Sequence, residues 1–332
     1  ASVLDRCTHL LRVVCVLILA LTPPASAQCD GRWLTGPEQV PPGVTNGVLS
    51  LAVLPNGELI DGGTLTQAGG LCANGIARWT GSTWGPLGSG MNDSVDCLAV
   101  LPNGDVVAGG RFTIAGGLAA NSIAKWNGSS WAPLGLGMNG PVFAIATLPN
   151  GDLVAGGAFT SAGGVTANRV ARWNGSTWSP MGSGMNQAVR SLTRLPNGDV
   201  VAGGSFTIAG GLPVNRIARW DGVSWAALGA GVSGGPAPSV LASVVMPNGE
   251  LAVGGSFTDA GGVTVRHLAR WDGVAWSSIG FGVSSTVRAL AAMPNGDLYA
   301  GGDFNSTFTG DGGDVANQIA RWDGLTWSPL VG

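Results

Sequence analysis

Residues 142–178 read VFAIATLPNGDLVAGGAFTSAGGVTANRVARWNGSTW, and close copies of this stretch recur along the chain. Each copy contains Pro-Asn-Gly followed by an acidic residue, two Gly-Gly pairs, and two tryptophans separated by a short turn. A fixed spacing of this kind indicates a repeat architecture. The turn prolines are Pro55, Pro102, Pro149, Pro196, Pro247 and Pro294, so the period is 47 residues in four intervals and 51 in the other.

Each copy predicts four short β-strands. The segment before the turn alternates apolar and small residues with a period of two, which is typical of a strand. Pro-Asn-Gly fits a type I turn, because proline favours its first central position and glycine takes the positive φ that follows. The apolar run that ends at Gly-Gly is the second strand, and Ile-Ala-Arg-Trp is the third. Asn-Gly or Asp-Gly then turns tightly into a fourth strand that carries the second tryptophan.

Four strands in a repeat of this length predict one blade of a β-propeller. We expect an all-β fold, a six-bladed β-propeller of four-stranded antiparallel blades, with seven blades or a larger repeat array as alternatives. A β-solenoid fits less well, because its coils are usually shorter. The predicted blades are 43–89, 90–136, 137–183, 184–234, 235–281 and 282–332.

The unusual composition follows from the repeats. The 332 residues include 57 glycines and 13 tryptophans, while only 11% are charged. The glycines show no Gly-X-Y period, which excludes collagen, and so much glycine would destabilise a helical bundle. A hydrophobic content of 45% with a net charge of −3 also argues against a disordered chain.

The glycine pair that closes the second strand and the two aromatic residues around the third turn carry a family resemblance. At these positions the chain resembles the kelch and galactose-oxidase type of propeller. It is most similar to secreted bacterial kelch-like repeats of the form GG-x-F-T-x-A-G-G…N-x-I-A-x-W. The resemblance covers residues 43–332 and implies a propeller fold. Its functional implication is broad, since kelch-like blades serve both as binding scaffolds and as enzymes.

The first 27 residues predict a secretory signal peptide. Arg6 and Arg12 precede an apolar core, and Ala-Ser-Ala at residues 25–27 fits the small-x-small rule for cleavage after Ala27. We therefore expect a secreted, extracellular protein, with a lipoprotein anchored through Cys29 as the alternative. Residues 28–42 are interpreted as an N-terminal latch segment, because Asp-Gly-Arg-Trp at 30–33 imitates the entry to a fourth strand.

Charge and cysteine content limit the expected partners. Beyond residue 27 the chain has 14 basic and 18 acidic residues, a balance that argues against nucleic acid and against membranes as partners. An exported chain can form a disulfide, but Cys29, Cys72 and Cys97 allow three pairings and match no metal motif. We expect a monomer that binds no cofactor and no metal.

Most charged residues recur at fixed positions in the repeat and are interpreted as structural. An acid begins the second strand and a base ends the antiparallel third strand, so each blade should hold an ion pair worth about 0.2–1 kcal/mol. The tryptophan pairs are likewise interpreted as packing between blades rather than as ligand-stacking surfaces. The predicted ion pairs are Glu58–Arg78, Asp105–Lys125, Asp152–Arg172, Asp199–Arg219, Glu250–Arg270 and Asp297–Arg321.

The common catalytic constellations are missing from the sequence. His267 is the only histidine after residue 27, which argues against a Ser-His-Asp triad, a multi-histidine metal site and galactose-oxidase-like copper chemistry. The Asp-x-Gly-x-Thr-Trp box of sialidase propellers is not reproduced either. A carboxylate pair for glycoside hydrolysis is left open. Asp311 and Asp314 offer oxygen ligands for calcium, although a solvated polar insertion is the preferred interpretation.

Function is expected where the six copies differ. They diverge at three variable positions: the residue six before the turn proline, the residue after the first Gly-Gly, and the residue after the repeat asparagine. The long connections should bring these positions to one face, at the mouth of the central channel, where loops on a rigid frame collect binding residues. Drift on a tolerant rim is the alternative. The candidate ligand-binding residues are Asp96, Phe143, Arg190, Arg288, Arg111, Asp303, Arg169, Arg216 and His267.

Three functions remain open at this point. The leading hypothesis is a secreted, non-enzymatic propeller that binds a protein or a cell-surface glycan through this face. The second is a hydrolase or lyase that acts on polysaccharide with carboxylates and arginines around Asp96, Arg190 and Arg288. The third is a structural repeat segment of a larger surface protein. The shortage of histidines favours the first hypothesis over the second.

Overall fold

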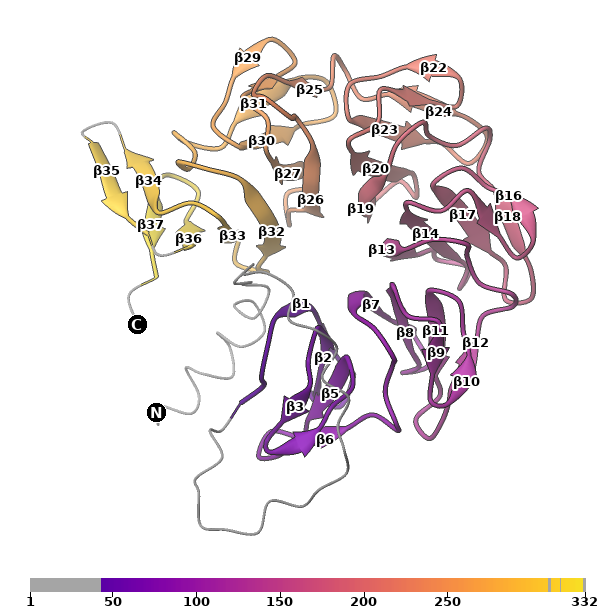
Figure 1. The fold of residues 1–332 in the computed structure, drawn as a ribbon. Helices are drawn as coiled ribbons and strands as arrows, with labels where there is room; N and C mark the ends of the chain where they lie inside the picture. The colour runs from indigo at the N-terminus through magenta and orange to yellow at the C-terminus, as the bar shows by residue number, and fades with distance from the viewer. Residues whose placement is uncertain (1–42, 310–311, 317, 331–332) are drawn as a thin grey trace.

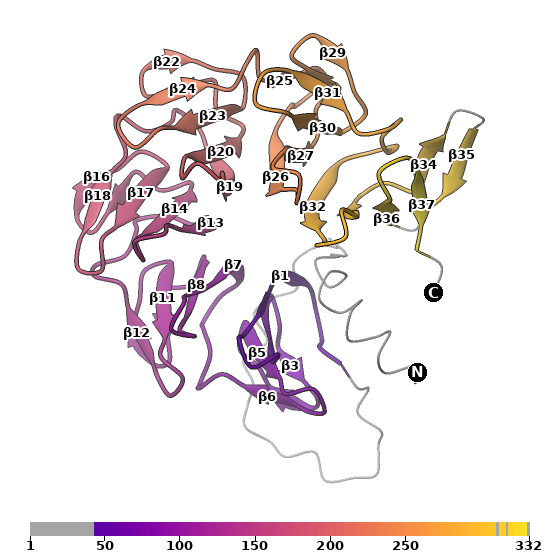
Figure 2. The same cartoon turned by 180° about the vertical axis from the view of Figure 1, so that it is seen from behind.

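The computed structural model describes residues 43–309, 312–316 and 318–330, and the regular structure in these ranges is all β-strand. Six four-stranded antiparallel sheets follow one another along the chain. Figure 1 shows the sheets arranged as blades around a common centre, and Figure 2 shows the same arrangement from behind. The predicted all-β propeller of four-stranded blades is therefore confirmed. The predicted signal peptide at 1–27 and latch at 28–42 lie outside the described residues.

Within each blade the strands pair in chain order from the centre outward. The first blade consists of β1 (Val48–Val53), β2 (Leu59–Gly63), β5 (Ile76–Trp79) and β6 (Trp84–Pro86). The other five are β7 (Val95–Val100), β8 (Val106–Gly110), β11 (Ile123–Trp126), β12 (Trp131–Pro133); β13 (Val142–Thr147), β14 (Leu153–Gly157), β17 (Val170–Trp173), β18 (Trp178–Pro180); β19 (Val189–Arg194), β20 (Val200–Gly204), β23 (Ile217–Trp220), β24 (Trp225–Ala227); β26 (Val240–Val245), β27 (Leu251–Gly255), β30 (Leu268–Trp271), β31 (Trp276–Ser278); and β32 (Val287–Ala292), β33 (Leu298–Gly302), β36 (Ile319–Trp322), β37 (Trp327–Pro329).

A small hairpin occupies the connection between the second and third strands of each blade. The hairpins are β3 (Gln67–Ala68) with β4 (Leu71–Cys72), β9 (Ile114–Ala115) with β10 (Leu118–Ala119), β15 (Ser161–Ala162) with β16 (Val165–Thr166), β21 (Ile208–Ala209) with β22 (Leu212–Pro213), β28 (Asp259–Ala260) with β29 (Val263–Thr264), and β34 (Ser306–Thr309) with β35 (Gly312–Val315). The extra strand β25 (Val232–Ser233) pairs with β28.

The connection that enters a blade pairs with that blade's hairpin. Met91 forms an isolated bridge with Ala115, and the side chain of Asn92 accepts the Thr113 and Ile114 amides at 2.9 Å each. Equivalent bridges join Met138 to Ala162 and Met185 to Ala209. Both long connections therefore lie on the same face of the propeller, as the sequence predicted. We call it the long-loop face.

The core of the molecule lies between successive blades. The second strands are almost completely buried, and their Gly-Gly pairs permit the close approach: a Cβ on Gly109 would lie 2.7 Å from Val142 of the next blade. The second tryptophan of a blade donates its indole N–H to a carbonyl of the preceding blade, as Trp178 does to Leu134 at 2.8 Å. The same bond joins Trp131 to Leu87, Trp225 to Met181, Trp276 to Leu228 and Trp327 to Ile279.

These contacts confirm the structural roles predicted for the recurring residues. The tryptophans of each pair pack against one another with ring centres 5.2–5.6 Å apart, and in the second to sixth blades the second member bonds to the preceding blade. All six predicted ion pairs are present, for example Lys125–Asp105 at 2.9 Å and Arg321–Asp297 at 2.8 Å. Their acids are mostly buried and their bases are about two-fifths exposed. The recurring tryptophans and charged residues therefore form the structural frame of the propeller.

The first and last blades each have one face without a described neighbour (Figures 1 and 2). Val48 at the start of β1 is partly exposed, whereas its five counterparts in the other blades are fully buried. Tyr299 of β33 is also partly exposed, although its counterpart Val154 is buried against the next blade. No helix in the described ranges is both long enough and apolar enough to span a bilayer.

Candidate functional site

The innermost strand of every blade begins with a β-bulge. In the pairing of β7 with β8, Val95 lies opposite Gly110 and Cys97 lies opposite Gly109, so Asp96 between them has no partner. A bulge of this kind changes the direction of the extra residue's side chain. The bulged residues coincide with the first variable position of the repeat, and they are Leu49, Asp96, Phe143, Arg190, Leu241 and Arg288.

The second variable position lies beside the bulge in the same blade. Arg111 donates from its Nε to the Asp96 carboxylate at 3.2 Å, and its backbone N–H bonds to the residue before the inner strand. In the last blade Arg288 makes two hydrogen bonds of 2.7 Å to Asp303. Two blades thus hold an ion pair at the start of the inner strand. In the second blade the acid is at the first variable position and the base at the second, and in the last blade the order is reversed.

Arg190 differs because the second variable position of its own blade does not hold an acid. The residue at its second variable position is Ser205, which bonds to Ser239 at 3.1 Å. The Arg190 guanidinium carbon lies instead 4.3 Å from the ring centre of Phe143 in the preceding blade, and that of Arg111 lies 5.5 Å from the same ring. Three consecutive blades therefore bring four predicted residues together. We call Asp96, Arg111, Phe143 and Arg190 the channel-mouth cluster.

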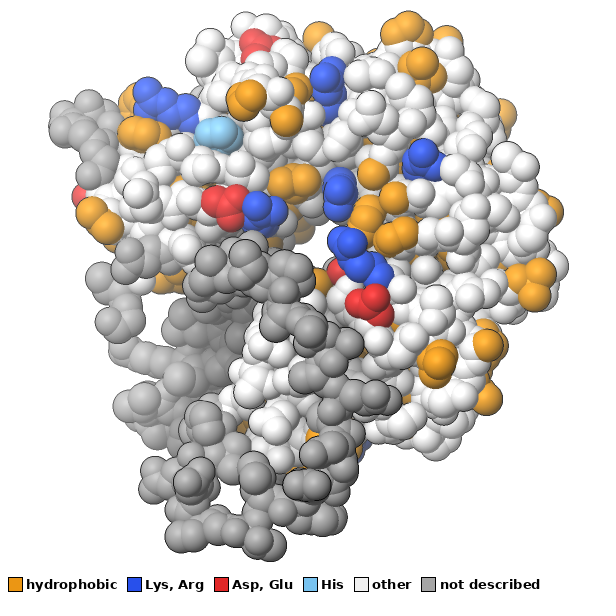
Figure 3. All heavy atoms as spheres, in the orientation of Figure 1, with side chains coloured by type: hydrophobic (Ala, Val, Ile, Leu, Met, Phe, Trp, Pro, Cys, Tyr) orange, Lys and Arg blue, Asp and Glu red, His pale blue; other side chains and the backbone are white. Residues whose placement is uncertain are grey.

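Basic and acidic side chains gather around the central opening of this face (Figure 3). Burial lowers the pKa of Arg190, and the positive charge of Arg111 lowers it further, while Asp96 raises it and Arg288 lowers it. The hydrogen bonds that Arg288 donates to the Asp303 carboxylate raise the pKa of Arg288. Arg111 and Arg288 are each paired with a carboxylate, so the positive charge without a described acidic partner is centred on Arg190.

The third variable position holds left-handed backbone. Its residues are Gly75, Ser122, Arg169, Arg216, His267 and Gln318, with φ between 63° and 70°. The backbone fixes this conformation: Arg169 N–H donates to the Phe159 carbonyl, and the Arg169 carbonyl accepts from Gly157, both at 2.9 Å. Each residue immediately precedes its blade's third strand, which lies two strands out from the channel.

Three candidate residues occupy this third variable position, two strands out from the inner strands. Arg169, Arg216 and His267 lie on the long-loop face, but no described hydrogen bond or ion pair links them to the channel-mouth cluster. Arg169 donates to the Phe159 carbonyl at 2.9 Å. Arg216 Nε and His267 Nδ1 are buried without a hydrogen-bond partner among the described residues, and burial lowers the pKa of His267.

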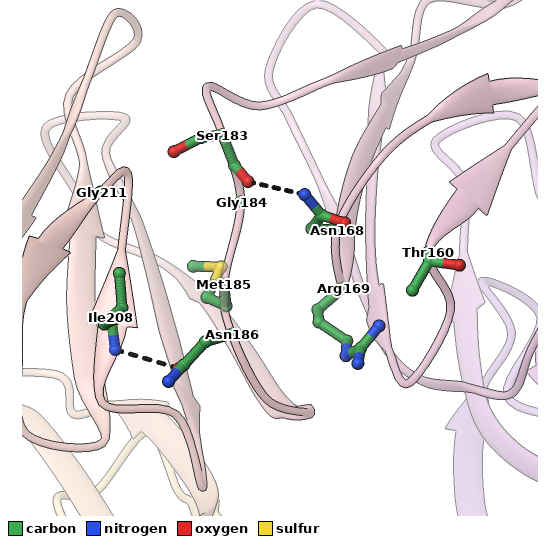
Figure 4. A pocket seen from close by; sticks show the side chains of 9 residues that line it. All are labelled: Thr160, Asn168, Arg169, Ser183, Gly184, Met185, Asn186, Ile208 and Gly211. Atoms are coloured by element: carbon green, nitrogen blue, oxygen red, sulfur yellow. Dashed lines mark hydrogen bonds between the residues drawn. The ribbon is translucent and has the colours of Figure 1, made fainter.

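Shallow grooves separate neighbouring blades on this face. The groove between the third and fourth blades encloses about 340 Å³, and Figure 4 shows Asn168, Arg169 and Asn186 in its lining. An equivalent groove of about 490 Å³ lies one blade earlier and includes Arg111. Asn168 donates to the Ser183 carbonyl at 3.1 Å, and Asn186 accepts the Ile208 amide at 3.0 Å, so both asparagines hold the frame.

Sequence reasoning did not single out the clamp formed by Asn92, Asn139 and Asn186. Each follows a methionine in a Gly-Met-Asn signature, and its side chain ties the connection between blades to the next hairpin through bonds of 2.8–3.0 Å. The recurrence of that signature at the repeat period was the available signal. These bonds keep the long-loop face in one shape beneath its variable side chains.

The other predicted sites concern thiols and metals. Cys72 is exposed and Cys97 is buried, and both are free thiols, while Cys29 lies outside the described residues. Within the described part of the chain, no group of histidine, cysteine, aspartate or glutamate residues is arranged to hold a metal ion. Asp311 of the suggested calcium site lies outside that part as well.

Comparison with known families supports the fold. Residues 148–175 and 247–271 match a family described as a domain of unknown function (DUF5122) beta-propeller. Both segments run from the Pro-Asn-Gly turn to the region of the first tryptophan, so they are two copies of the same part of the repeat. The chain is a β-propeller. The match does not confirm the kelch and galactose-oxidase type, and no curated protein matches the chain in sequence.

Solved structures of low sequence identity share the propeller's fold. An extracellular domain from B. thetaiotaomicron has a TM-score of 0.58 and 13% identity, over 86% of this chain and 33% of its own, so the propeller spans about a third of that relative's length. Virginiamycin B lyase from Staphylococcus aureus has a TM-score of 0.52 and 14% identity, covering 87% and 85%. YCF48 bound to D1 peptide has a TM-score of 0.53 and 17% identity, covering 88% and 84%.

Proposed function

We propose that this propeller is a secreted, non-enzymatic scaffold that binds a protein through its long-loop face. One observation carries the proposal: a bulge repeated in six inner strands presents the most variable side chains of the chain around the channel mouth. The frame below them is nearly identical in every blade. Propellers and other rigid frames present their binding sites as variable side chains on an invariant backbone.

Several further observations support binding rather than catalysis. The Asp96 carboxylate accepts hydrogen bonds from both Arg111 and Ser94, so it is held as a structural partner. His267 is separated from the channel-mouth cluster. The signal-like residues 1–27 support secretion, and an extracellular domain is among the structures with this fold. YCF48, which has a similar fold, was solved with a peptide bound.

Two arginines of the same strand give the test a matched control. Arg190 begins β19 on the long-loop face, whereas Arg194 ends β19 beside the Pro-Asn-Gly turn and is also exposed. The purified chain and the variants Arg190→Gln and Arg194→Gln would capture proteins from cell-surface and secreted fractions of the organism that makes it, with quantitative mass spectrometry as the readout. We expect at least one protein to be captured by both the parent chain and Arg194→Gln but not by Arg190→Gln. Equal capture by all three would contradict binding at this face.

A further inference from the structure

We infer that the channel-mouth cluster binds a carboxylate of a peptide, which Arg190 receives through the edge of its guanidinium group. This inference rests on the proposed function, because it names the chemistry that the long-loop face recognises. The carboxylate belongs to an acidic side chain or to a chain terminus.

The first step is the balance of charge at the channel mouth. Arg111, Arg190 and Arg288 contribute three positive charges at the first and second variable positions, whereas Asp96 and Asp303 contribute two negative ones, and Asp93 lies near enough to Asp96 to raise its pKa. Both acids are engaged by their own arginines at 3.2 Å and 2.7 Å. The positive charge of Arg190 has no ion-pair partner among the described residues. A bound anion would satisfy it.

The second step is the geometry of Arg190. Its guanidinium carbon lies over the Phe143 ring, 4.3 Å from the ring centre, so the two groups are in contact. A guanidinium held by an aromatic ring keeps its N–H donors directed outward, and a carboxylate matches that fork with two parallel hydrogen bonds. Ion pairing of Arg111 and Arg288 limits their own movement. The site is thus ordered before a ligand arrives, which lowers the entropic cost of binding.

The third step distinguishes a peptide from a sugar. The second tryptophans of the second to sixth blades are buried and donate their indole N–H groups to neighbouring blades, so they offer no platform for stacking a sugar. The bulged residues of the blades on either side of Arg190, Phe143 and Leu241, are apolar and partly exposed instead. A charged centre flanked by apolar side chains suits a polypeptide, which pairs an acidic group with apolar neighbours.

The experiment uses the arginine Nε–Hε cross peaks of the full chain in two-dimensional NMR, with the Arg190 peak assigned by its loss in Arg190→Gln. The probes are acetyl-Gly-Glu-Leu-Gly-amide, its glutamine counterpart, and acetyl-Gly-Gly-Leu-Gly with a free C-terminus. Glucuronate serves as the acidic-sugar probe. We expect a saturable shift of the Arg190 peak with at least one carboxylate peptide and none with the glutamine peptide. Whichever carboxylate peptide binds identifies the side chain or the terminus as the source.

Two variants test the assignment to Arg190. Arg190→Lys keeps the charge but loses the planar fork, so it should weaken peptide binding about tenfold or more, whereas Arg194→Gln should bind as the parent chain does. Equal shifts of all arginine peaks, equal binding of the glutamine peptide, or tighter binding of glucuronate would overturn the inference. If the inference is overturned in this way but Arg190→Gln still fails to retain a protein in the capture experiment, the proposed function stands and only the carboxylate chemistry is wrong.

Discussion

Replacing Asp61 with alanine should stabilise the folded propeller at neutral and alkaline pH. Asp61 lies in the middle of β2, between Leu51 of β1 and Ala77 of β5, and is only 2% exposed. Its Oδ1 has no hydrogen-bond partner among the described residues. Burial raises the pKa of this carboxyl from 3.8 to about 7. At the same place the other blades carry Ala108, Ala155, Ala202, Val253 and Ala300.

The magnitude follows from the pKa shift. A rise of about three units corresponds to about 4 kcal/mol, at 1.36 kcal/mol per unit. Because the folded state binds the proton more tightly than the unfolded state, the carboxyl causes no loss of stability below about pH 4. The loss grows between about pH 4, where the unfolded chain releases the proton, and about pH 7, and it is complete above that pH because the buried group is then ionised in the folded state as well. Asp61→Ala removes that group, so it should raise the free energy of unfolding at pH 8 by up to about 4 kcal/mol.

Urea unfolding of the parent chain and Asp61→Ala at several pH values between 4 and 8 measures this difference. The variant should gain stability over the parent chain as the pH rises, and the two should differ by about 1 kcal/mol or less at pH 4. Ala108→Asp serves as the reciprocal control, since it places a carboxyl at the same position of the second blade and should lose stability with rising pH. If Asp61→Ala is less stable than the parent chain at pH 8, Asp61 is satisfied by a partner and the reasoning is refuted.

Three further changes test the frame beneath the site. Arg216→Gly should stabilise the chain by about 1 kcal/mol, because φ is 63° there, glycine adopts this conformation without strain, and the buried Nε of Arg216 has no hydrogen-bond partner among the described residues; thermal unfolding would show it as a higher Tm. Trp178→Phe leaves the buried Leu134 carbonyl without its indole donor, so urea titration should show a loss of about 1–3 kcal/mol. Hydrogen bonds from Arg321 lower the pKa of Asp297, so this ion pair stabilises the folded state above about pH 4 and loses that effect on acidification. Asp297→Asn should therefore lower the free energy of unfolding by about 0.2–1 kcal/mol at pH 7 and by less at pH 3, as measured by denaturant midpoints.

Much of the fold was predictable because six copies repeat the same local information. Pro-Asn-Gly reports a turn within one copy, whereas the Gly-Gly pairs and the tryptophans mark positions that pack closely against a neighbouring blade. The pairing of Lys125 with Asp105 also followed from antiparallel strands of known order. All of these features recur at fixed positions of the repeat. They could therefore be recognised without knowing how one blade meets the next.

The candidate site depended on features that the residue spacing within a single copy does not reveal. The bulge that changes the direction of Asp96 and Arg190 arises from the pairing of two strands, and alternation within one strand does not reveal it. The contact of Arg190 with Phe143 crosses between blades, so no spacing inside a repeat predicts it. The pairing of Arg111 with Asp96 was accessible in principle, since opposite charges recur fifteen residues apart there and at Arg288 with Asp303.

Site-specific photo-cross-linking tests the central claim most directly. Leu241 is the bulged residue at one end of β26, and Asn248 lies in the turn beyond the other end of the same strand. Benzoylphenylalanine at each position in turn would be irradiated with a protein that the parent chain captures. We predict cross-links to that protein from position 241 and none from position 248. Cross-links from position 248 alone, or equally from both, would contradict binding through the long-loop face.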